Sequence, residues 1–447
     1  MQKVKPALLR GFDQEYLPAE QLQFNRLIDI IRRNFELYGF LPIETPSAER
    51  REILTSKGGV EKEIYALTRL AEAEDDDAST KGALRFDLTV PLARYVAMRE
   101  RELAFPFRRY QIQRVWRGET PQANKGRFRE FYQCDIDIIG REKLSYLAEA
   151  EIPSVIYSVF REMAIGEFRI RINNRKVLKG LLQHFSVAED KSPAVLRILD
   201  KVEKERADSV RAQLEKEGVT KDGLYALVAA KRSTADTLRV LAEFPACEAG
   251  LKELSAIAHA IRQFGVPDDA FAIDLGVVRG LDYYTGTIYE TTLTSAPELG
   301  SICSGGRYDD LASYFTDTKL PGVGISIGLT RLFSRLLEAK LLRPLEDTPA
   351  TVLVTTMDAR YLEKYLKIAS QLRSARINTE VYLEQAKIDK QLQYANRKEF
   401  RIALIAGETE ISSGQIQVKN LMTRQATTVP EADVVKAVQQ ALGKKEG

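Results

Sequence analysis

RVWRGETPQANKGRFREFYQCDID, from Arg114 to Asp137, is the stretch that decides the fold. Two strand-like runs in it flank a basic, glycine-containing loop. Within 13 residues it carries Arg117, Lys125, Arg127 and Arg129. Arginine grips an anion with two parallel N–H groups and does not lose its charge, so such a hairpin is suited to holding phosphate groups. A solvated hairpin with surface ion pairs explains this stretch alone equally well.

The second strand of this hairpin is polar on one face. Side chains alternate across a strand, so the run YQCDIDII directs two sets of residues to opposite faces. One face carries Gln133, Asp135 and Asp137, and the other carries Cys134, Ile136 and Ile138. Three polar groups on one face of a central strand require a reason.

The segments around the hairpin predict a sheet with helices packed on it. Residues 19–38 have apolar side chains at helical spacing, Gly39 is placed to end that helix, and FLPIETP follows as an extended run. Strand-like sequence continues in ALRFDLTVPLARYVAM and RRYQIQRVWRGE. It returns in FAIDLGVVRGLDYYTGTIYETT and GSICSGGRYDDL, and GVGISIGLTRLFSRLLEAKLL is a strand that enters a helix. The prediction is an α+β domain over residues 1–340, with an antiparallel sheet flanked by helices.

Two further units are predicted from composition. Residues 184–265 are rich in charged, helix-forming residues and are interpreted as a helical insertion. Residues 341–349 lie in a polar, proline-containing stretch that is typical of a linker. Strand and helix patterns then alternate over residues 350–447, which predicts a compact α/β domain with a largely buried sheet.

Composition excludes several classes of protein. The excess of basic over acidic residues is 66 − 63 = 3, so charge alone does not indicate a nucleic-acid binder. No run approaches the roughly 20 apolar residues that span a bilayer, and no secretory signal is visible, so we expect a cytoplasmic protein without a membrane contact. Its three cysteines form no CxxC pair, and its two histidines, His184 and His259, lie far apart in helical segments. We therefore expect no protein-borne metal site and no histidine-based catalytic triad.

Two more stretches carry candidate binding residues. VVRGLDYYTGTIYE places Arg279 at the mouth of a predicted strand, with Tyr283 and Tyr284 after it, although tyrosines in strands are usually packing residues. PGVGISIGLTRL places Arg331 early in a helix, where its side chain could reach back to the sheet. The glycines of this stretch follow the pattern GxGxxxG, which is one residue off the dinucleotide-binding spacing, so that interpretation is rejected.

Taken in order, these stretches resemble the class II aminoacyl-tRNA synthetases, and specifically the histidyl-tRNA synthetase family. FELYGFLPIETP is similar to the first class motif, the arginine hairpin to the second and GVGISIGLTRL to the third. RGLDYYTG and SICSGGRYDDL are similar to stretches particular to the histidine enzymes. The resemblance covers nearly the whole chain and implies a class II catalytic domain, with residues 350–447 as an anticodon-binding domain.

The resemblance also implies roles for individual residues. Asp87, Thr89 and Gln133 would hold the amino group of histidine, with Leu88 in the same binding segment, and Asp137, Tyr283 and Tyr284 would form the imidazole pocket. Arg117 would bind the α-phosphate and Arg331 the γ-phosphate of ATP, and Arg279 would lie between the substrate carboxylate and the α-phosphate. These three arginines are the implied catalytic residues. An ionised carboxylate such as Asp137 accepts a hydrogen bond from a ring N–H, and a wrong amino acid would leave it unpaired.

The implied activity is the ATP-dependent attachment of histidine to tRNA(His) by a homodimer, with Mg²⁺ arriving as its complex with ATP. Two departures from the family pattern concern Thr330, where an acidic residue is common, and the longer hairpin loop TPQANKG. Four basic residues of the C-terminal domain could approach RNA phosphates or form a solvated helix face: Lys387, Lys390, Arg397 and Lys398. The alternative function is a catalytically inactive, synthetase-like regulatory or sensor protein, which usually lacks catalytic arginines or the C-terminal domain.

Overall fold

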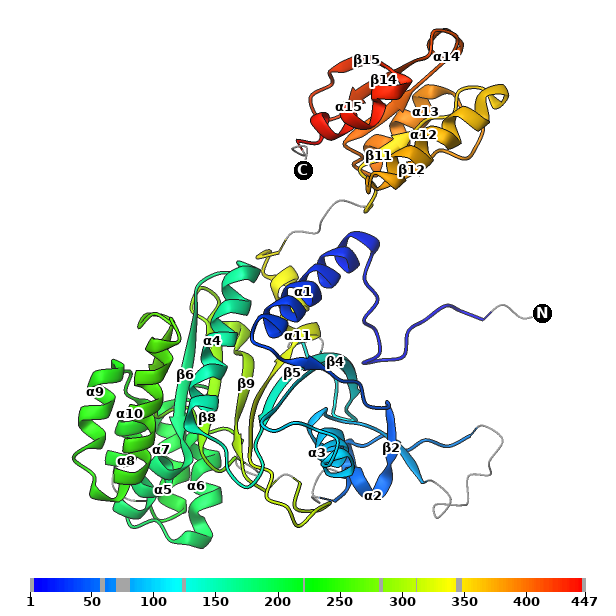
Figure 1. The fold of residues 1–447 in the computed structure, drawn as a ribbon. Coiled ribbons are helices and arrows are strands. Elements are labelled where there is room, and N and C mark those ends of the chain that lie inside the picture. Colours follow the sequence, from blue (N-terminus) through cyan, green and yellow to red (C-terminus); the bar gives the residue numbers. More distant parts are fainter. Residues whose placement is uncertain are drawn as a thin grey trace. The chain divides into compact units, whose positions relative to one another are not determined.

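A computed structural model describes most of the chain (Figure 1). The described residues are 4–56, 61–69, 81–122, 126–219, 222–280, 284–310, 312–342 and 348–443. The chain forms two compact units, one of Met1–Gln14 with Leu27–Arg343 and the other of Glu15–Arg26 with Pro344–Gly447. Of the predicted linker, residues 343–347 lie outside the described residues.

The larger unit is built on a sheet in which eight strands are described, in the order β1-β4-β5-β10-β9-β8-β6-β7. The strands are β1 (Leu41–Pro42), β4 (Phe107–Trp116), β5 (Glu130–Ile139), β6 (Phe168–Asn174), β7 (Phe271–Ile273), β8 (Thr287–Leu293), β9 (Ser301–Tyr308) and β10 (Gly322–Gly328). Neighbouring strands are antiparallel, except that β1 pairs with β4 and β6 with β7 in parallel. The predicted antiparallel sheet is thus confirmed as the centre of a mixed sheet.

Strands β4 and β5 form the arginine hairpin, and the polar face predicted for the second strand lies in the middle of this pair. In its register Arg109 lies opposite Asp137, Gln111 opposite Asp135, and Gln113 opposite Gln133. On its other side β5 pairs with β10, which places Gly324 beside Asp137 and Ser326 beside Asp135. The predicted alternation is confirmed, because Gln133, Asp135 and Asp137 line a pocket while Cys134, Ile136 and Ile138 are buried.

The helices that accompany the sheet include α1 (Pro18–Leu37), α4 (Tyr146–Met163) and α11 (Leu329–Glu338) (Figure 1). Helix α11 contacts β5, and α4 contacts β10 and β6. The C-terminal part of α1 joins α4 through Asn34, whose side-chain oxygen accepts a hydrogen bond from the Ser158 hydroxyl at 2.5 Å. Gly39 has a φ of +74°, a left-handed conformation that ends α1 as the sequence predicted.

One predicted strand region is a helix. Within ALRFDLTVPLARYVAM, β3 (Gly82–Leu84) pairs with β2 (Ala48–Arg50), which α2 (Arg51–Leu54) follows, but α3 runs from Thr89 to Arg99. The strand prediction was therefore wrong for these residues. Val90, Ala93 and Val96 bury one face of α3 at helical spacing, and proline is tolerated in a first turn, where Pro91 lies.

The segment predicted as an insertion, residues 184–265, contains a set of helices beside β6 (Figure 1). The helices described within it are α6 (Ser192–Leu199), α7 (Ala207–Lys216), α8 (Gly223–Ala229), α9 (Thr234–Leu241) and α10 (Glu248–Gln263), and α5 (Arg175–His184) precedes it and ends at its first residue. Arg171 of β6 ties them to the sheet, because its guanidinium pairs with Glu203 at 2.7 Å and with Asp274 at 2.8 Å. His184 packs edge-on against the ring of Phe244, which gives this histidine a packing role.

The second unit holds a separate sheet in the order β12-β11-β13-β14-β15. Its elements are β11 (Val352–Val354), α12 (Leu362–Ser374), β12 (Thr379–Val381), α13 (Ile388–Arg397), β13 (Ile402–Ile405), α14 (Glu408–Ser412), β14 (Gln415–Asn420), β15 (Ala426–Pro430) and α15 (Val434–Ala441). The predicted α/β alternation is confirmed, whereas β15 and α14 were not predicted. In the described parts of both units, no helix combines the length and the apolar composition that crossing a membrane requires.

Candidate active site

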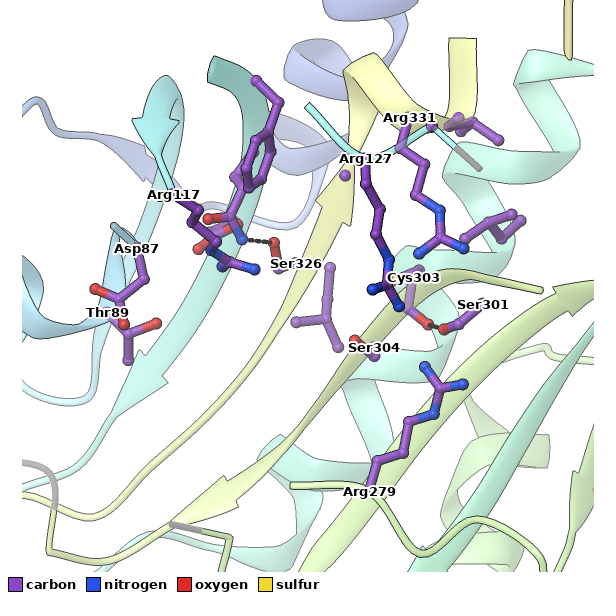
Figure 2. Close-up of a pocket in the computed structure, with 18 of the residues that line it drawn as sticks. Asp87, Thr89, Arg117, Arg127, Arg279, Ser301, Cys303, Ser304, Ser326 and Arg331 are labelled. Atoms are coloured by element: carbon purple, nitrogen blue, oxygen red, sulfur yellow. Dashed lines mark hydrogen bonds between the residues drawn. The ribbon is translucent and has the colours of Figure 1, made fainter. Parts of the chain in front are cut away.

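A pocket of about 540 Å³ lies over the polar face of β5 (Figure 2). Eight of the ten residues proposed from sequence line it: Asp87, Thr89, Arg117, Gln133, Asp137, Arg279, Tyr284 and Arg331. Leu88 is fully buried and is not among the lining residues, and Tyr283 lies outside the described residues. The structure therefore brings together side chains that are up to 244 positions apart in sequence, since 331 − 87 = 244.

Asp87 and Thr89 reach the pocket because α3 begins there. The Asp87 carboxylate accepts a hydrogen bond from the backbone N–H of Val90 at 3.1 Å, which satisfies one of the free donors in the first turn of the helix. Thr89 is the first residue of α3. Figure 2 shows both side chains on one side of the pocket, away from Arg127, Arg279 and Arg331.

Gln133 and Asp135 occupy the middle of the polar face. The Gln133 amide donates a hydrogen bond to the Ser326 hydroxyl at 2.7 Å (Figure 2). Asp135 is only 3% exposed, and its Oδ1 has no hydrogen-bond partner among the described residues. Burial raises the pKa of Asp135 to about 7, against the opposing effect of the Arg109 guanidinium.

Asp137 is held from two sides by residues that the sequence analysis did not single out. The Tyr308 hydroxyl donates a hydrogen bond to its Oδ1 at 2.7 Å, and the guanidinium of Arg109 forms an ion pair with its Oδ2. Arg109 is completely buried, and its N–H groups make no aligned hydrogen bond to any described residue, so its attraction to the carboxylates is mainly electrostatic. Burial raises the pKa of Asp137, and Arg109 and the Tyr308 hydroxyl oppose this rise.

Gly324 leaves the space that Asp137 occupies. A Cβ atom at this position would lie 2.1 Å from the Asp137 Oδ1 and 2.4 Å from the carbonyl oxygen of Ile136. We therefore expect Gly324→Ala to lower the free energy of unfolding by about 3 kcal/mol, because an overpacked strand must shift. The measurement is thermal unfolding. Gly328→Ala is the matched stability control on the same strand, since its Cβ would meet no atom within 4 Å, and an equal loss in both variants would contradict the steric argument.

The opposite end of the pocket is strongly cationic. Arg127, Arg279 and Arg331 direct their guanidinium groups toward one space (Figure 2), and Arg335 lines the same region. Burial lowers the pKa of Arg331, and the nearby charges of Arg127, Arg279 and Arg335 lower it further. Guanidinium groups gathered in this way repel one another, so a bound polyanion would stabilise the arrangement.

Arg117 and Arg279 are each oriented by their surroundings. The Nε–H of Arg117 donates to the carbonyl of Phe86 at 3.0 Å, and its guanidinium lies over the Phe131 ring at 5.1 Å. The Nε of Arg279 pairs with Glu290 at 2.8 Å and lies 3.6 Å from Asp200. Arg279 is not at the mouth of a strand, as the sequence suggested, but in an irregular segment before β8, whose first residue is Thr287. Tyr284 is also outside a strand.

The sequence departs from the family pattern at Thr330 and in the hairpin loop, and the structure describes the first of these positions in full. Thr330 is buried, and its hydroxyl accepts a hydrogen bond from the backbone N–H of Tyr132 at 2.8 Å, which joins α11 to β5. The side chain at this position thus has a structural contact without an acidic group. Residues 123–125 of the hairpin loop lie outside the described residues.

With this geometry established, comparison with known proteins identifies the family. The family profile named Histidyl-tRNA synthetase matches residues 13–332, and the profile named Anticodon binding domain matches residues 350–441. The chain belongs to the histidyl-tRNA synthetase family. This membership confirms the resemblance read from the class motifs.

Individual relatives cover this synthetase almost from end to end. A histidine–tRNA ligase of Xanthomonas campestris is 46% identical, over 98% of this chain and 96% of the relative. That of Clostridium tetani is 44% identical, over 98% and 99%. The crystal structure of histidyl-tRNA synthetase from Nostoc sp. PCC 7120 is 42% identical and superposes with a TM-score of 0.89, over 98% of this chain and 100% of that one.

Sequence reasoning missed several lining or supporting residues of the synthetase pocket. Arg109, Ser326 and Tyr308 were not proposed, and Asp135 was noticed without a role. A signal for Arg109 and Asp135 existed in the hairpin itself. Folding RRYQIQ against YQCDIDII about the basic loop pairs Arg109 with Asp137 and Gln111 with Asp135, as the structure has it.

Proposed function

We propose that this chain activates histidine with ATP to form histidyl-adenylate and then transfers the histidyl group to tRNA(His). Membership of the histidyl-tRNA synthetase family supports the activity and implies the use of ATP. The observation that carries the proposal at atomic level is a single pocket with carboxylates at one end and guanidinium groups at the other. Such a pocket is complementary to an amino acid whose carboxylate faces the α-phosphate of a nucleoside triphosphate.

The amino-acid end would bind both polar groups of histidine. Asp87, Thr89 and Gln133 would receive the α-ammonium group, since a carboxylate, a hydroxyl and an amide oxygen are all acceptors. Leu88, whose side chain is buried, would contribute only through its backbone. The imidazole would lie toward Asp137 and Tyr284, with Tyr283 as a further wall of the pocket. Support for this orientation comes from the deep burial of Asp137 and its place at the far end of the polar face.

The cationic end would bind the triphosphate. Arg117 lies on the side of Asp87 in Figure 2 and would bind the α-phosphate, whereas Arg331 would bind the γ-phosphate. Arg279 would lie between the carboxylate of histidine and the α-phosphate. Arg127 and Arg335 line the same region and extend the cationic surface toward the β- and γ-phosphates. The magnesium complex of ATP would be the substrate.

The first reaction needs alignment more than acid or base chemistry. An oxygen of the histidine carboxylate, already ionised at neutral pH, attacks the α-phosphorus, and the bond from that phosphorus to the bridging oxygen of the β-phosphate breaks. Pyrophosphate leaves with the electron pair, and guanidinium groups stabilise the charge that builds on the α-phosphate. In the second reaction a terminal ribose hydroxyl of the tRNA attacks the histidyl carbonyl. AMP then leaves, and its phosphate is the proton acceptor.

We also propose partners other than histidine and ATP. The match of residues 350–441 to an anticodon-binding domain supports tRNA as the acceptor. Its exposed residues Lys387, Lys390 and Arg397 are available to phosphates, whereas Lys398 pairs with Glu380 at 3.1 Å. A homodimer paired through the α1–β1 segment remains a prediction from the family resemblance. A cytoplasmic location remains a prediction from the sequence, in which no secretory signal and no membrane-spanning apolar run are visible.

The alternative is a synthetase-like regulatory or sensor protein. The structure of an ATP phosphoribosyltransferase regulatory subunit/histidyl-tRNA synthetase from Bacillus halodurans superposes with a TM-score of 0.72, but at 19% identity it shows a shared fold alone. Retention of Arg117, Arg279 and Arg331 in one pocket favours the enzyme.

The test is exchange of labelled pyrophosphate into ATP by the purified chain with each of the twenty amino acids in turn. We expect exchange only with histidine, because a side chain that does not place a ring N–H at the buried carboxylates of the pocket leaves them unpaired. Transfer of labelled histidine to tRNA(His) then tests the second step. A flat response across all twenty amino acids would favour the regulatory protein.

A further inference from the structure

A series of ion pairs connects the helical insertion to Arg279, one of the three proposed catalytic arginines. Its central members are Arg171 of β6 and Glu290 of β8, which lie directly opposite each other in the antiparallel register. The Arg171 Nη1 lies 3.2 Å from the Glu290 Oε2, and the Glu290 Oε1 lies 2.8 Å from the Nε of Arg279. Glu290 is buried, so one carboxylate holds two guanidinium groups away from water, one on each oxygen.

The position of Glu290 is suited to orienting Arg279 and not to binding a substrate. Arg279 lines the pocket, whereas Glu290 is not among the lining residues. Burial lowers the pKa of Arg331, and the charges of Arg127 and Arg279 lower it further, so these guanidinium groups repel one another across the cationic end. The attraction of Glu290 opposes this repulsion. Together the two forces fix where the Arg279 guanidinium lies.

The insertion reaches both arginines through the turn that follows α6. Within this turn the Glu203 carboxylate accepts two hydrogen bonds from the Arg171 guanidinium, at 2.7 and 2.8 Å. Three residues earlier, the Asp200 Oδ1 lies 3.6 Å from the Nε of Arg279, while its Oδ2 pairs with Lys204 at 2.6 Å. One turn of the insertion therefore contacts Arg279 directly and also contacts the cation that holds its partner.

Arg171 is shared among three carboxylates, and this sharing links their effects. Its guanidinium lies 2.7 Å from Glu203, 2.8 Å from Asp274 and 3.2 Å from Glu290. Glu290 has the longest of these contacts, so much of its negative charge stays available to Arg279. Removing the charge of Glu203 would direct more of the Arg171 charge to Glu290. The hold of Glu290 on Arg279 would weaken as a result.

We infer that Glu290 is a positioning residue for Arg279, and that the helical insertion sets its hold on Arg279 through Glu203 and Arg171. This inference rests on the proposed function, in which Arg279 stabilises charge on the α-phosphate. A displacement of about 1 Å at a reacting group can lower a rate about 10²-fold, so the orientation of one guanidinium matters. The insertion then contributes to activation of the amino acid without touching either substrate.

The test measures kcat and KM for ATP in histidine-dependent pyrophosphate exchange. Glu290→Gln keeps the shape of the side chain and removes its charge, which leaves Asp200 as the remaining ion-pair partner of Arg279 among the described residues. We expect kcat to fall about 10- to 100-fold and KM for ATP to change less than about 3-fold. In the Arg279→Ala background, the same substitution should change the rate by less than about 2-fold, because the group that it positions is absent.

A second variant tests the contribution of the insertion at a residue whose loss the fold tolerates. The Glu203 side chain is 41% exposed, so Glu203→Gln should fold even if Glu290→Gln does not. We expect it to lower kcat about 3- to 10-fold, and again only while Arg279 is present. Glu205→Gln is the matched control, since Glu205 pairs with Lys201 at 3.6 Å in the same region, and it should leave kcat unchanged.

The outcomes separate the inference from the proposed function. Thermal unfolding verifies that each variant is folded. Losses of equal size with and without Arg279 would show a general structural role and overturn the inference, as would an unchanged kcat in the folded variants. Absence of exchange by the wild-type chain would instead refute the proposed function, and the inference with it.

Discussion

Replacing Arg279 with alanine is expected to lower the rate of histidine-dependent pyrophosphate exchange by about 10²- to 10³-fold, the effect of removing one preorganised donor from a developing charge. The side chain is placed for this task because Glu290 fixes its Nε at 2.8 Å and leaves the rest of the guanidinium facing the pocket. Charge increases on the α-phosphate during attack, so the contact strengthens in the transition state. Binding of ATP should weaken far less.

The measurement compares the exchange rate with the dissociation constant of ATP obtained by calorimetry. The variant should still bind ATP because Arg117, Arg127 and Arg331 still line the pocket. Arg239→Ala is the control, since the Arg239 side chain is 75% exposed in the helical segment and pairs only with the nearby Asp236 among the described residues. Equal losses in exchange and in ATP affinity would mean that Arg279 binds the nucleotide without a selective effect on the reaction.

Much of the fold could be predicted from sequence because its elements carry local signals. The helical spacing of apolar residues in α1, with Gly39 after them, predicts a helix, and the alternation of polar and apolar residues in β5 predicts a strand. Each of these signals lies within one segment. Helix α3 was missed because its apolar residues are dense and include the β-branched Val90 and Val96, a composition also typical of strands, and because Pro91 lacks the backbone N–H of a helix interior. The burial of one face of α3 against the sheet, which tertiary packing supplies, decides between the two.

The residues of the candidate site also fall into two groups, those with a local sequence signal and those without one. Residues such as Arg117, Arg331 and Asp87 could be proposed because they lie in stretches with a family pattern. Arg109 and Tyr308 could not, because their importance comes from which strand lies beside β5 and in which register. A single strand's pattern says which face a side chain occupies, but not which partner on a neighbouring strand reaches it.

The ring contact of Asp137 is likewise implied by family resemblance and stays a prediction. Family resemblance transfers a role to a position, and it does not reveal whether the protein itself already occupies that carboxylate. In the structure, Tyr308 and Arg109 engage Asp137, while the Oδ1 of Asp135 has no hydrogen-bond partner among the described residues. Partner assignment, rather than residue type, is what distinguishes the two aspartates.

Removing Arg109 should produce the largest stability effect in the catalytic unit. Arg109→Leu leaves Asp135 and Asp137 buried without a cation, and breaking a buried ion pair from one side lowers the free energy of unfolding by about 3–5 kcal/mol. The expected fall in the thermal midpoint is roughly 10 °C at pH 8. Arg108→Leu is the control on the same strand, because its side chain is 32% exposed and its pair with Glu151 is partly solvated, so its loss should stay within about 1 kcal/mol.

The pH dependence of this effect follows from the two carboxyl groups. Burial raises the pKa of both, that of Asp135 to about 7, so between about pH 4 and pH 7 the folded chain binds more protons than the unfolded chain and stability falls as pH rises. Arg109 opposes that rise in pKa, and without it the carboxyl groups stay protonated to higher pH. The stability difference between Arg109→Leu and wild type should therefore be small at pH 5 and larger at pH 8.

A second substitution separates charge from packing. Asp137→Asn in the Arg109→Leu background removes one of the two unpaired charges, so it should recover more than half of the lost stability at pH 8, while Asp137→Asn alone leaves Arg109 facing Asp135. Thermal unfolding of the four proteins at both pH values completes the cycle. A loss that is equal at pH 5 and pH 8, and that Asp137→Asn does not recover, would show that Arg109 contributes by filling space and not by balancing the carboxylates.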